Sequence, residues 1–143
     1  MTQMPGSKRT VLLIDDSEDD RLFMRRALHQ HHRLAVVGEV CDGEEAVAYL
    51  SGEGVFANRA DYPFPDILLL DLKMPRKTGF EVLQWLQTQA FQDLVVIVVS
   101  GSSLREDVTK STALGADAYL KKGALKEEYA AMVREIEASL DQC

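Results

Sequence analysis

Several apolar segments of this sequence end in side chains that can bind a metal ion or react with a phosphoryl group. Asp15 and Asp16 end the first segment, Asp71 ends "DILLLD", Ser100 ends "DLVVIVVS", and Lys122 ends "ADAYLKK". Carboxylates packed together raise one another's pKa unless a cation lies among them. Mg²⁺ prefers oxygen ligands and commonly takes one or two carboxylates together with phosphate oxygens. The residue types therefore favour a magnesium site, provided that the segment ends meet.

An aspartate beside such an ion can attack a phosphoryl group and form an acyl phosphate. The metal ion, a lysine and a hydroxyl group would then hold the phosphoryl oxygens. Asp71 is the predicted nucleophile, because it is a single acid at the end of the apolar run 67–70.

The elements that must position these residues alternate along the chain. Strands are predicted at 10–15, 33–40, 66–71, 93–100 and 116–122, and helices at 17–31, 42–52, 78–89, 103–115 and 125–140. Such alternation predicts a parallel sheet of the doubly wound α/β class. Ligands bind beyond the carboxyl ends of the strands in these sheets. The residues that end the strands are therefore expected to share one edge of the domain.

The composition narrows the class of protein. The chain has 143 residues, the size of one domain, which we expect to comprise an N-terminal tail at 1–9 and a folded part at 10–143. A net charge of −7 argues against direct binding to nucleic acid or to an anionic membrane. No apolar run approaches the roughly 20 residues of a membrane span. The N-terminus has no signal-peptide core, and the expected location is the cytoplasm.

From about Thr10 to Leu140 the chain resembles response-regulator receiver domains. The resemblance is carried by "VLLIDDS", "DILLLDLKMPRKTG", "VVIVVSGSS" and "GADAYLKKG", in the order and spacing of that family. It implies a flavodoxin-like fold, in which a five-stranded sheet of order 2-1-3-4-5 is flanked by five helices. A long segment before strand 66–71, together with "MPRKTG", resembles the single-domain regulators that pair with bacterial phytochromes.

The resemblance also implies roles for particular residues. Asp71 would accept a phosphoryl group from a histidine kinase, here one of the phytochrome type. Mg²⁺ would be bound by Asp16, by Asp71 and by the backbone carbonyl of Lys73, and Asp15 would contribute mainly through water. No catalytic activity as an enzyme is implied.

Three further residues have implied roles in signalling. Ser100 would hydrogen-bond the phosphoryl group, Lys122 would pair with it, and Tyr119 would be the switch aromatic that follows Ser100. Output to an unidentified downstream protein would pass through the surface formed by 103–115, 116–122 and 125–140, which could also form a homodimer. The chain departs from the family in having Gly123 where a proline, often after a cis peptide, is usual, and Gly101 where alanine is common.

Other interpretations remain at this stage. Asp19 and Asp20 are interpreted as acids that favour the start of helix 17–31, because the helical rise should carry them away from the sheet edge. A phosphatase of the haloacid-dehalogenase type would also use a strand-end aspartate, but it needs a second aspartate at position 73, which is lysine. A receiver-like adaptor that works without phosphorylation is the main alternative.

Overall fold

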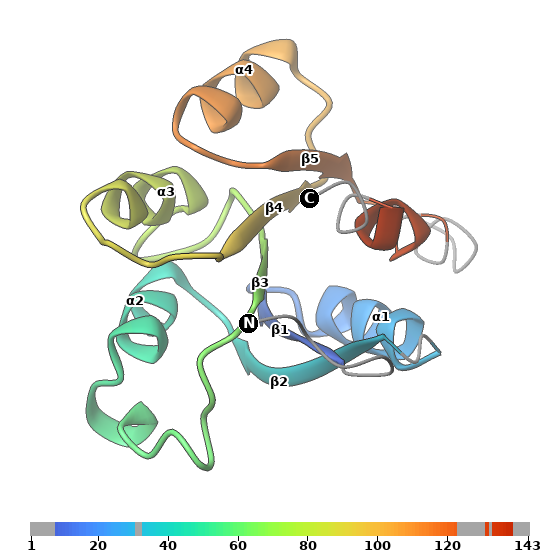
Figure 1. Cartoon of the computed structure of the whole chain (residues 1–143). Coiled ribbons are helices and arrows are strands. Elements are labelled where there is room, and N and C mark those ends of the chain that lie inside the picture. The colour runs from blue at the N-terminus through green and yellow to red at the C-terminus, as the bar shows by residue number, and fades with distance from the viewer. Residues whose placement is uncertain (1–7, 31–32, 123–130, 132, 139–143) are drawn as a thin grey trace.

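Five parallel strands form the centre of the molecule. In this computed structural model the described residues are 8–30, 33–122, 131 and 133–138. The strands are β1 (Arg9–Ile14), β2 (Leu34–Val40), β3 (Ile67–Leu70), β4 (Val95–Ser100) and β5 (Ala118–Lys121). Their spatial order is β2-β1-β3-β4-β5, which confirms the predicted topology (Figure 1).

Helices cover both faces of this sheet (Figure 1). They are α1 (Glu18–His29), α2 (Gly43–Ser51), the 3₁₀ helix η1 (Gly54–Phe56), α3 (Gly79–Gln87) and α4 (Arg105–Ala113). Residues 133–138 are helical and belong to the predicted helix 125–140, most of which lies outside the described residues. No helix within the described part of the chain is long and apolar enough to cross a membrane.

Side chains along each strand point alternately to the two faces of the sheet, and this divides the hydrophobic core into two parts. Leu13, Leu69 and Val99 face α1 and the helical residues 133–138, whereas Leu12 and Leu70 face the side of α2 and α3. Successive side chains of a strand point to opposite faces, so a strand covered by helices on both faces is apolar throughout. This explains why "ILLL" of β3 is completely buried.

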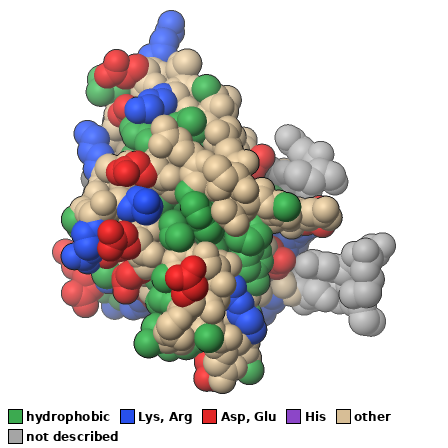
Figure 2. All heavy atoms as spheres, turned by 90° about the vertical axis from the view of Figure 1, so that its left-hand side faces the viewer, with side chains coloured by type: hydrophobic (Ala, Val, Ile, Leu, Met, Phe, Trp, Pro, Cys, Tyr) green, Lys and Arg blue, Asp and Glu red, His purple; other side chains and the backbone are tan. Residues whose placement is uncertain are grey.

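On the side of α2 and α3, hydrophobic groups reach the surface among charged ones (Figure 2). Partly buried aromatic residues of the segment between α2 and β3 pack against the core there, among them Phe56, Tyr62 and Phe64. Arg59 organises this segment, because its guanidinium donates to the carbonyls of Tyr49 and Leu50 at the end of α2. The long segment is therefore ordered by specific contacts, and it includes η1, which the sequence did not predict.

The predicted helix α2 has the expected ends. The Asp42 side chain accepts a hydrogen bond from the Glu45 N–H, and Gly52 is left-handed with φ of 69°. Strand β1 begins at Arg9, which pairs with Leu34 in the sheet, and the division of the chain into a tail at 1–9 and a folded part at 10–143 stays a prediction. The peptide bond between Lys122 and Gly123, where the family usually has a proline, lies outside the described residues.

Candidate functional site

Backbone hydrogen bonds bring the polar strand ends to one edge of the sheet. The Asp71 N–H donates to the carbonyl of Ile14 at 2.9 Å, and the Lys122 N–H donates to the carbonyl of Ser100 at 2.8 Å. These bonds continue the parallel pairing of β1 with β3 and of β4 with β5 by one residue. Each functional side chain therefore leaves the backbone where its strand ends, as the sequence predicted.

Three carboxylates lie together at this edge. Asp15, Asp16 and Asp71 each place one oxygen within 4.8 Å of the others. Burial raises the pKa of Asp71 to about 6, although the Lys122 ammonium and the Leu72 N–H both favour its charged form. Burial raises the pKa of Asp15 as well. Carboxylate oxygens are the ligands that a small divalent cation such as Mg²⁺ prefers. A bound cation would also balance the poorly solvated negative charges of these acids.

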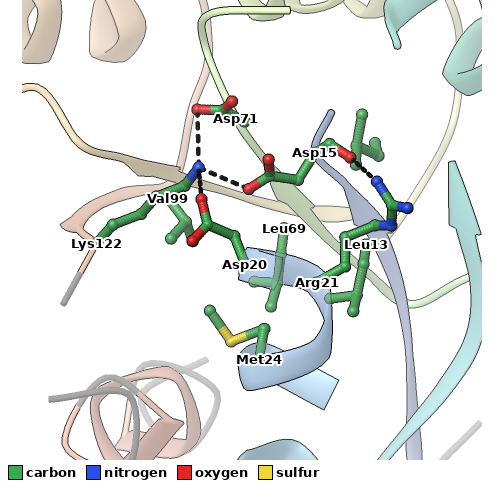
Figure 3. A pocket seen from close by; sticks show the side chains of 10 residues that line it. Leu13, Asp15, Asp20, Arg21, Met24, Leu69, Asp71, Val99 and Lys122 are labelled. Carbon is green, nitrogen blue, oxygen red and sulfur yellow. Dashed lines mark hydrogen bonds and ion pairs between the residues drawn. The ribbon is translucent and has the colours of Figure 1, made fainter. Parts of the chain in front are cut away.

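Lys122 is the cation that faces these acids in the structure (Figure 3). Its ammonium lies 2.7 Å from Asp15 Oδ2, 2.8 Å from Asp20 Oδ2 and 3.6 Å from Asp71 Oδ1. Burial alone would lower the pKa of Lys122, but the hydrogen bonds to Asp15 and Asp20 raise it. Lys122 is therefore charged at neutral pH and within reach of any group bound to Asp71.

The position of Asp20 differs from its interpretation as an acid at the start of a helix that the helical rise carries away from the sheet edge. Asp20 does lie in the first turn of α1, where Ser17 accepts its N–H, but its carboxylate also binds Lys122. The helix begins at the sheet edge, and side chains lean toward a helix's N-terminus, so the first turn still borders the site. Lys122 and Asp20 are 102 positions apart, and no local pattern could have paired them.

Arg21 is a second residue that the sequence did not single out. Its guanidinium donates to the backbone carbonyl of Asp15 and to the Glu39 carboxylate of β2. Figure 3 shows Arg21 on the far side of Asp15 from Lys122. It ties α1 to the end of β1, and so fixes the backbone that carries the acidic pair.

Ser100 and Tyr119 meet through a third residue. The buried Ser100 hydroxyl accepts the Ser102 N–H at 3.1 Å, and the Tyr119 hydroxyl donates to the Ser102 carbonyl at 2.7 Å. The Ser102 hydroxyl in turn donates to Asp107 of α4 at 2.6 Å. Hydrogen bonds through Ser102 therefore link Ser100 to Tyr119 and to α4.

The segment after Asp71 is fixed by the start of α3. Thr78 and Glu81 form a capping box, in which each side chain accepts the other residue's N–H. The Gly79 N–H donates to the Leu72 carbonyl, and a Cβ at position 79 would lie 2.3 Å from the Asp71 carbonyl oxygen. Only glycine allows this contact. Lys73 lies in this segment with its side chain exposed.

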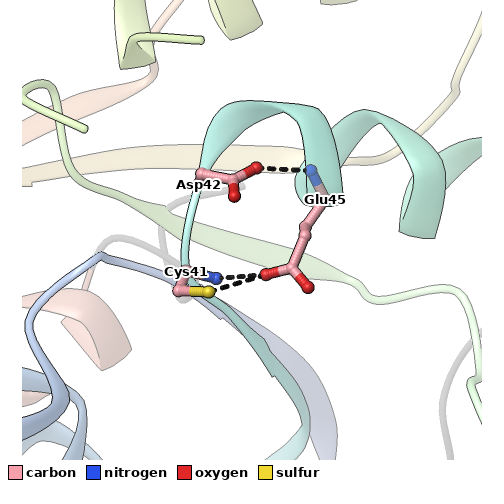
Figure 4. A group of neighbouring side chains, drawn as sticks. All are labelled: Cys41, Asp42 and Glu45. Atoms are coloured by element: carbon pink, nitrogen blue, oxygen red, sulfur yellow. Dashed lines mark hydrogen bonds between the residues drawn. The ribbon is translucent and has the colours of Figure 1, made fainter. Parts of the chain in front are cut away.

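A second group of acids lies near the end of β2 (Figure 4). Cys41, Asp42 and Glu45 also place ligand atoms within 4.8 Å of one another. The Cys41 N–H and thiol both donate to Glu45, and Asp42 accepts from the Glu45 N–H and from Arg76. Burial alone would raise the pKa of Asp42, but these donors lower it.

Comparison with known proteins agrees with the geometry. The family description "Response regulator receiver domain" matches residues 11–134. Response regulator Rcp1 from Synechocystis sp. is 30% identical over 142 residues, which are 96% of this chain and 92% of Rcp1. A structure of Rcp1 with bound Mn²⁺ has a TM-score of 0.77 and covers 91% of this chain and 92% of that one. The phosphorylated cyanobacterial phytochrome response regulator RcpA has a TM-score of 0.81 at 33% identity, with 92% of both chains covered.

Another relative contains this unit as a part. A protein-glutamate methylesterase/protein-glutamine glutaminase from Anaeromyxobacter dehalogenans is 39% identical over 113 residues, or 78% of this chain, and the match spans 29% of that protein. The matched region is a small part of that enzyme, so the enzyme's activity cannot be assigned to this chain. The family match, the nearly full-length likeness to Rcp1 and RcpA, and the sheet order together show that this chain belongs to the response-regulator receiver-domain family.

Proposed function

We propose that this response regulator accepts a phosphoryl group on Asp71 from the phosphohistidine of a histidine kinase. The observation that carries the proposal is the setting of Asp71, which is 6% exposed, ends the central strand, and faces two further acids and Lys122. An oxygen of its carboxylate would attack phosphorus while the bond from phosphorus to the imidazole nitrogen breaks. The electron pair of that bond stays on the imidazole.

The neighbouring residues have distinct proposed roles. Asp16, Asp71 and the backbone carbonyl of Lys73 would hold Mg²⁺, with Asp15 acting mainly through water. A bound Mg²⁺ supplies positive charge against the phosphoryl oxygens. Lys122 would pair with one phosphoryl oxygen. The likeness to Mn²⁺-bound Rcp1 supports a divalent metal at this edge.

Ser100 would donate its hydroxyl proton to another phosphoryl oxygen. Its oxygen accepts the Ser102 N–H, and the hydrogen bonds that join Ser102 to Tyr119 and Asp107 would carry a movement of Ser100 toward the phosphoryl group to α4. The expected readout surface is α4, β5 and the last helix, where Leu104 is 55% exposed. Dimer formation through this surface, a downstream protein partner and a cytoplasmic location stay predictions.

A phytochrome-type kinase is the proposed phosphoryl donor. The likeness to RcpA, a phytochrome response regulator, supports this partner, as does the long ordered segment between α2 and β3. The net charge of −7 is compatible with binding to such a kinase, since a protein partner can present a surface of complementary charge.

The test uses a small phosphodonor and intact mass. With acetyl phosphate and Mg²⁺, the wild-type chain should gain one phosphoryl group, and Asp71→Asn should gain none. Asp42→Asn is the matched control, because it changes another buried aspartate that lies outside the acceptor site, and it should be modified like the wild type. A wild type that stays unmodified would favour the phosphorylation-independent adaptor. Turnover of unrelated phosphomonoesters would favour an enzyme.

A further inference from the structure

Asp20 and Asp71 lie on different sides of the same ammonium group. Lys122 Nζ donates to Asp20 Oδ2 at 2.8 Å and lies 2.7 Å from Asp15, whereas Asp71 is at 3.6 Å, which is beyond a hydrogen bond. In Figure 3, Asp20 rises from α1 below Lys122 and Asp71 lies above it. Lys122 is therefore held closer to α1 than to the residue that accepts the phosphoryl group.

The two acids that hold Lys122 have different relations to the acceptor site. Asp15 belongs to the three carboxylates that face one another, but Asp20 is not in that group. Negative charge added at Asp71 would attract Lys122, and Asp20 would resist that movement through a direct ion pair. The side chains of Lys122 and Asp20 are 14% and 30% exposed, so water screens this pair only partly.

We propose that Asp20 is a positioning residue that holds Lys122 on the α1 side of the site and thereby limits how tightly the site binds a phosphoryl group. The inference rests on the proposed function, because it assumes that the phosphoryl group lies on Asp71. Asp20 and a phosphorylated Asp71 would compete for the ammonium of Lys122. The stronger the contact of Lys122 with Asp20, the weaker its contact with the phosphoryl group. Removal of the Asp20 charge should release Lys122 toward Asp71.

A purely structural role for Asp20 is the alternative. An acid in the first turn of a helix stabilises the helix through the macrodipole, whatever it faces. Asp19 provides the matched control, because it lies in the same first turn and is exposed. A helix effect should appear in both Asp19→Asn and Asp20→Asn, and a positioning effect in Asp20→Asn alone.

The first experiment measures binding of beryllofluoride, a mimic of the phosphoryl group, in the presence of Mg²⁺ by calorimetry. Asp20→Asn should bind the mimic roughly threefold to tenfold more tightly than the wild type, the size expected for one partly screened ion pair. Asp19→Asn should match the wild type. In a Lys122→Gln background, Asp20→Asn should have no further effect. Equal or weaker binding by Asp20→Asn, or an effect that persists without Lys122, would overturn the proposal.

A second measurement needs no phosphoryl group. A crystal structure of Asp20→Asn without a phosphoryl mimic should place Lys122 Nζ within hydrogen-bond distance of Asp71, closer than the 3.6 Å of the wild type. An unchanged distance contradicts the proposal even if Asp71 is never phosphorylated, so the two proposals can fail separately.

Discussion

Asp71 and Asp42 are both buried aspartates that lie just beyond a strand of the same sheet, and each belongs to a group of possible metal ligands. Their surroundings differ. Asp42 accepts from the Glu45 N–H and from Arg76, and these donors lower its pKa. Asp71 accepts from the Leu72 N–H, has other acids beside it, and has its pKa raised to about 6.

The difference shows what separates an acid whose charge the fold already satisfies from one whose charge it leaves poorly balanced. Ligand atoms within 4.8 Å occur in both groups, so proximity alone does not identify a site. Fixed donors from the same chain already satisfy Asp42, and a metal ion would have to replace them. The charge near Asp71 is balanced chiefly by Lys122, a flexible side chain that other acids share. Asp71 therefore gains more from an added cation than Asp42 does.

Metal binding should separate the two groups most strongly. Asp71→Asn should weaken Mg²⁺ binding by roughly tenfold or more, because it removes a direct carboxylate ligand. Asp42→Asn should leave the affinity within about twofold, since asparagine keeps the helix cap. Calorimetric titration with Mg²⁺ measures both. Loss of affinity in Asp42→Asn but not in Asp71→Asn would place the metal near the end of β2 instead.

The sequence predicted which strand ends meet better than it predicted what surrounds them. Asp71, Ser100 and Lys122 were predictable because a parallel sheet brings strand ends to one edge, and the apolar runs marked those ends. The contact of Asp20 with Lys122 joins the first turn of α1 to the residue that follows β5, which no local pattern records.

The same limit applies to the pairing of Asp42 with Arg76. Asp42 begins the predicted helix 42–52, but one of its two partners comes from the segment after β3, where Arg76 has a left-handed φ of 64°. A positive φ is uncommon at non-glycine residues, and the sequence does not show which residue of a turn adopts it. The motif "MPRKTG" supported only the family resemblance, and the fold shows that Arg76 reaches Asp42 at the start of α2.

The order of the two aspartates should be reversed for stability: substitution of Asp42 should destabilise the fold more than substitution of Asp71. Asp42→Ala should lower the free energy of unfolding by about 1–3 kcal/mol, because it removes a helix cap and leaves the Glu45 N–H and the Arg76 guanidinium without their acceptor. Asp71→Asn should cause no loss, since it removes a poorly solvated charge. Urea unfolding without Mg²⁺ measures both variants. A larger loss in Asp71→Asn than in Asp42→Ala would show that the acceptor acid is structural.

The pH dependence of stability should differ in sign between the two aspartates. The pKa of Asp71 is raised from its usual 3.8 to about 6, so the folded chain binds a proton between these values that the unfolded chain has lost. Its contribution to stability is therefore greatest below about pH 4 and is lost as the pH rises through 6. The lowered pKa of Asp42 gives a contribution that is present above 3.8 and is lost as the pH falls through the folded value.

Variants can isolate the Asp71 contribution. Without Mg²⁺, Asp71→Asn should gain stability relative to the wild type as the pH rises from 4 to 6, reaching on the order of 1–2 kcal/mol and staying constant above. This is less than the full shift in pKa allows, because the variant also weakens the attraction on Lys122. Urea unfolding at several pH values gives the difference. Saturating Mg²⁺ should make the wild type the more stable of the two, since the ion stabilises the ionised wild type. A stability difference that changes with neither pH nor Mg²⁺ would show that the charge of Asp71 does not destabilise the fold.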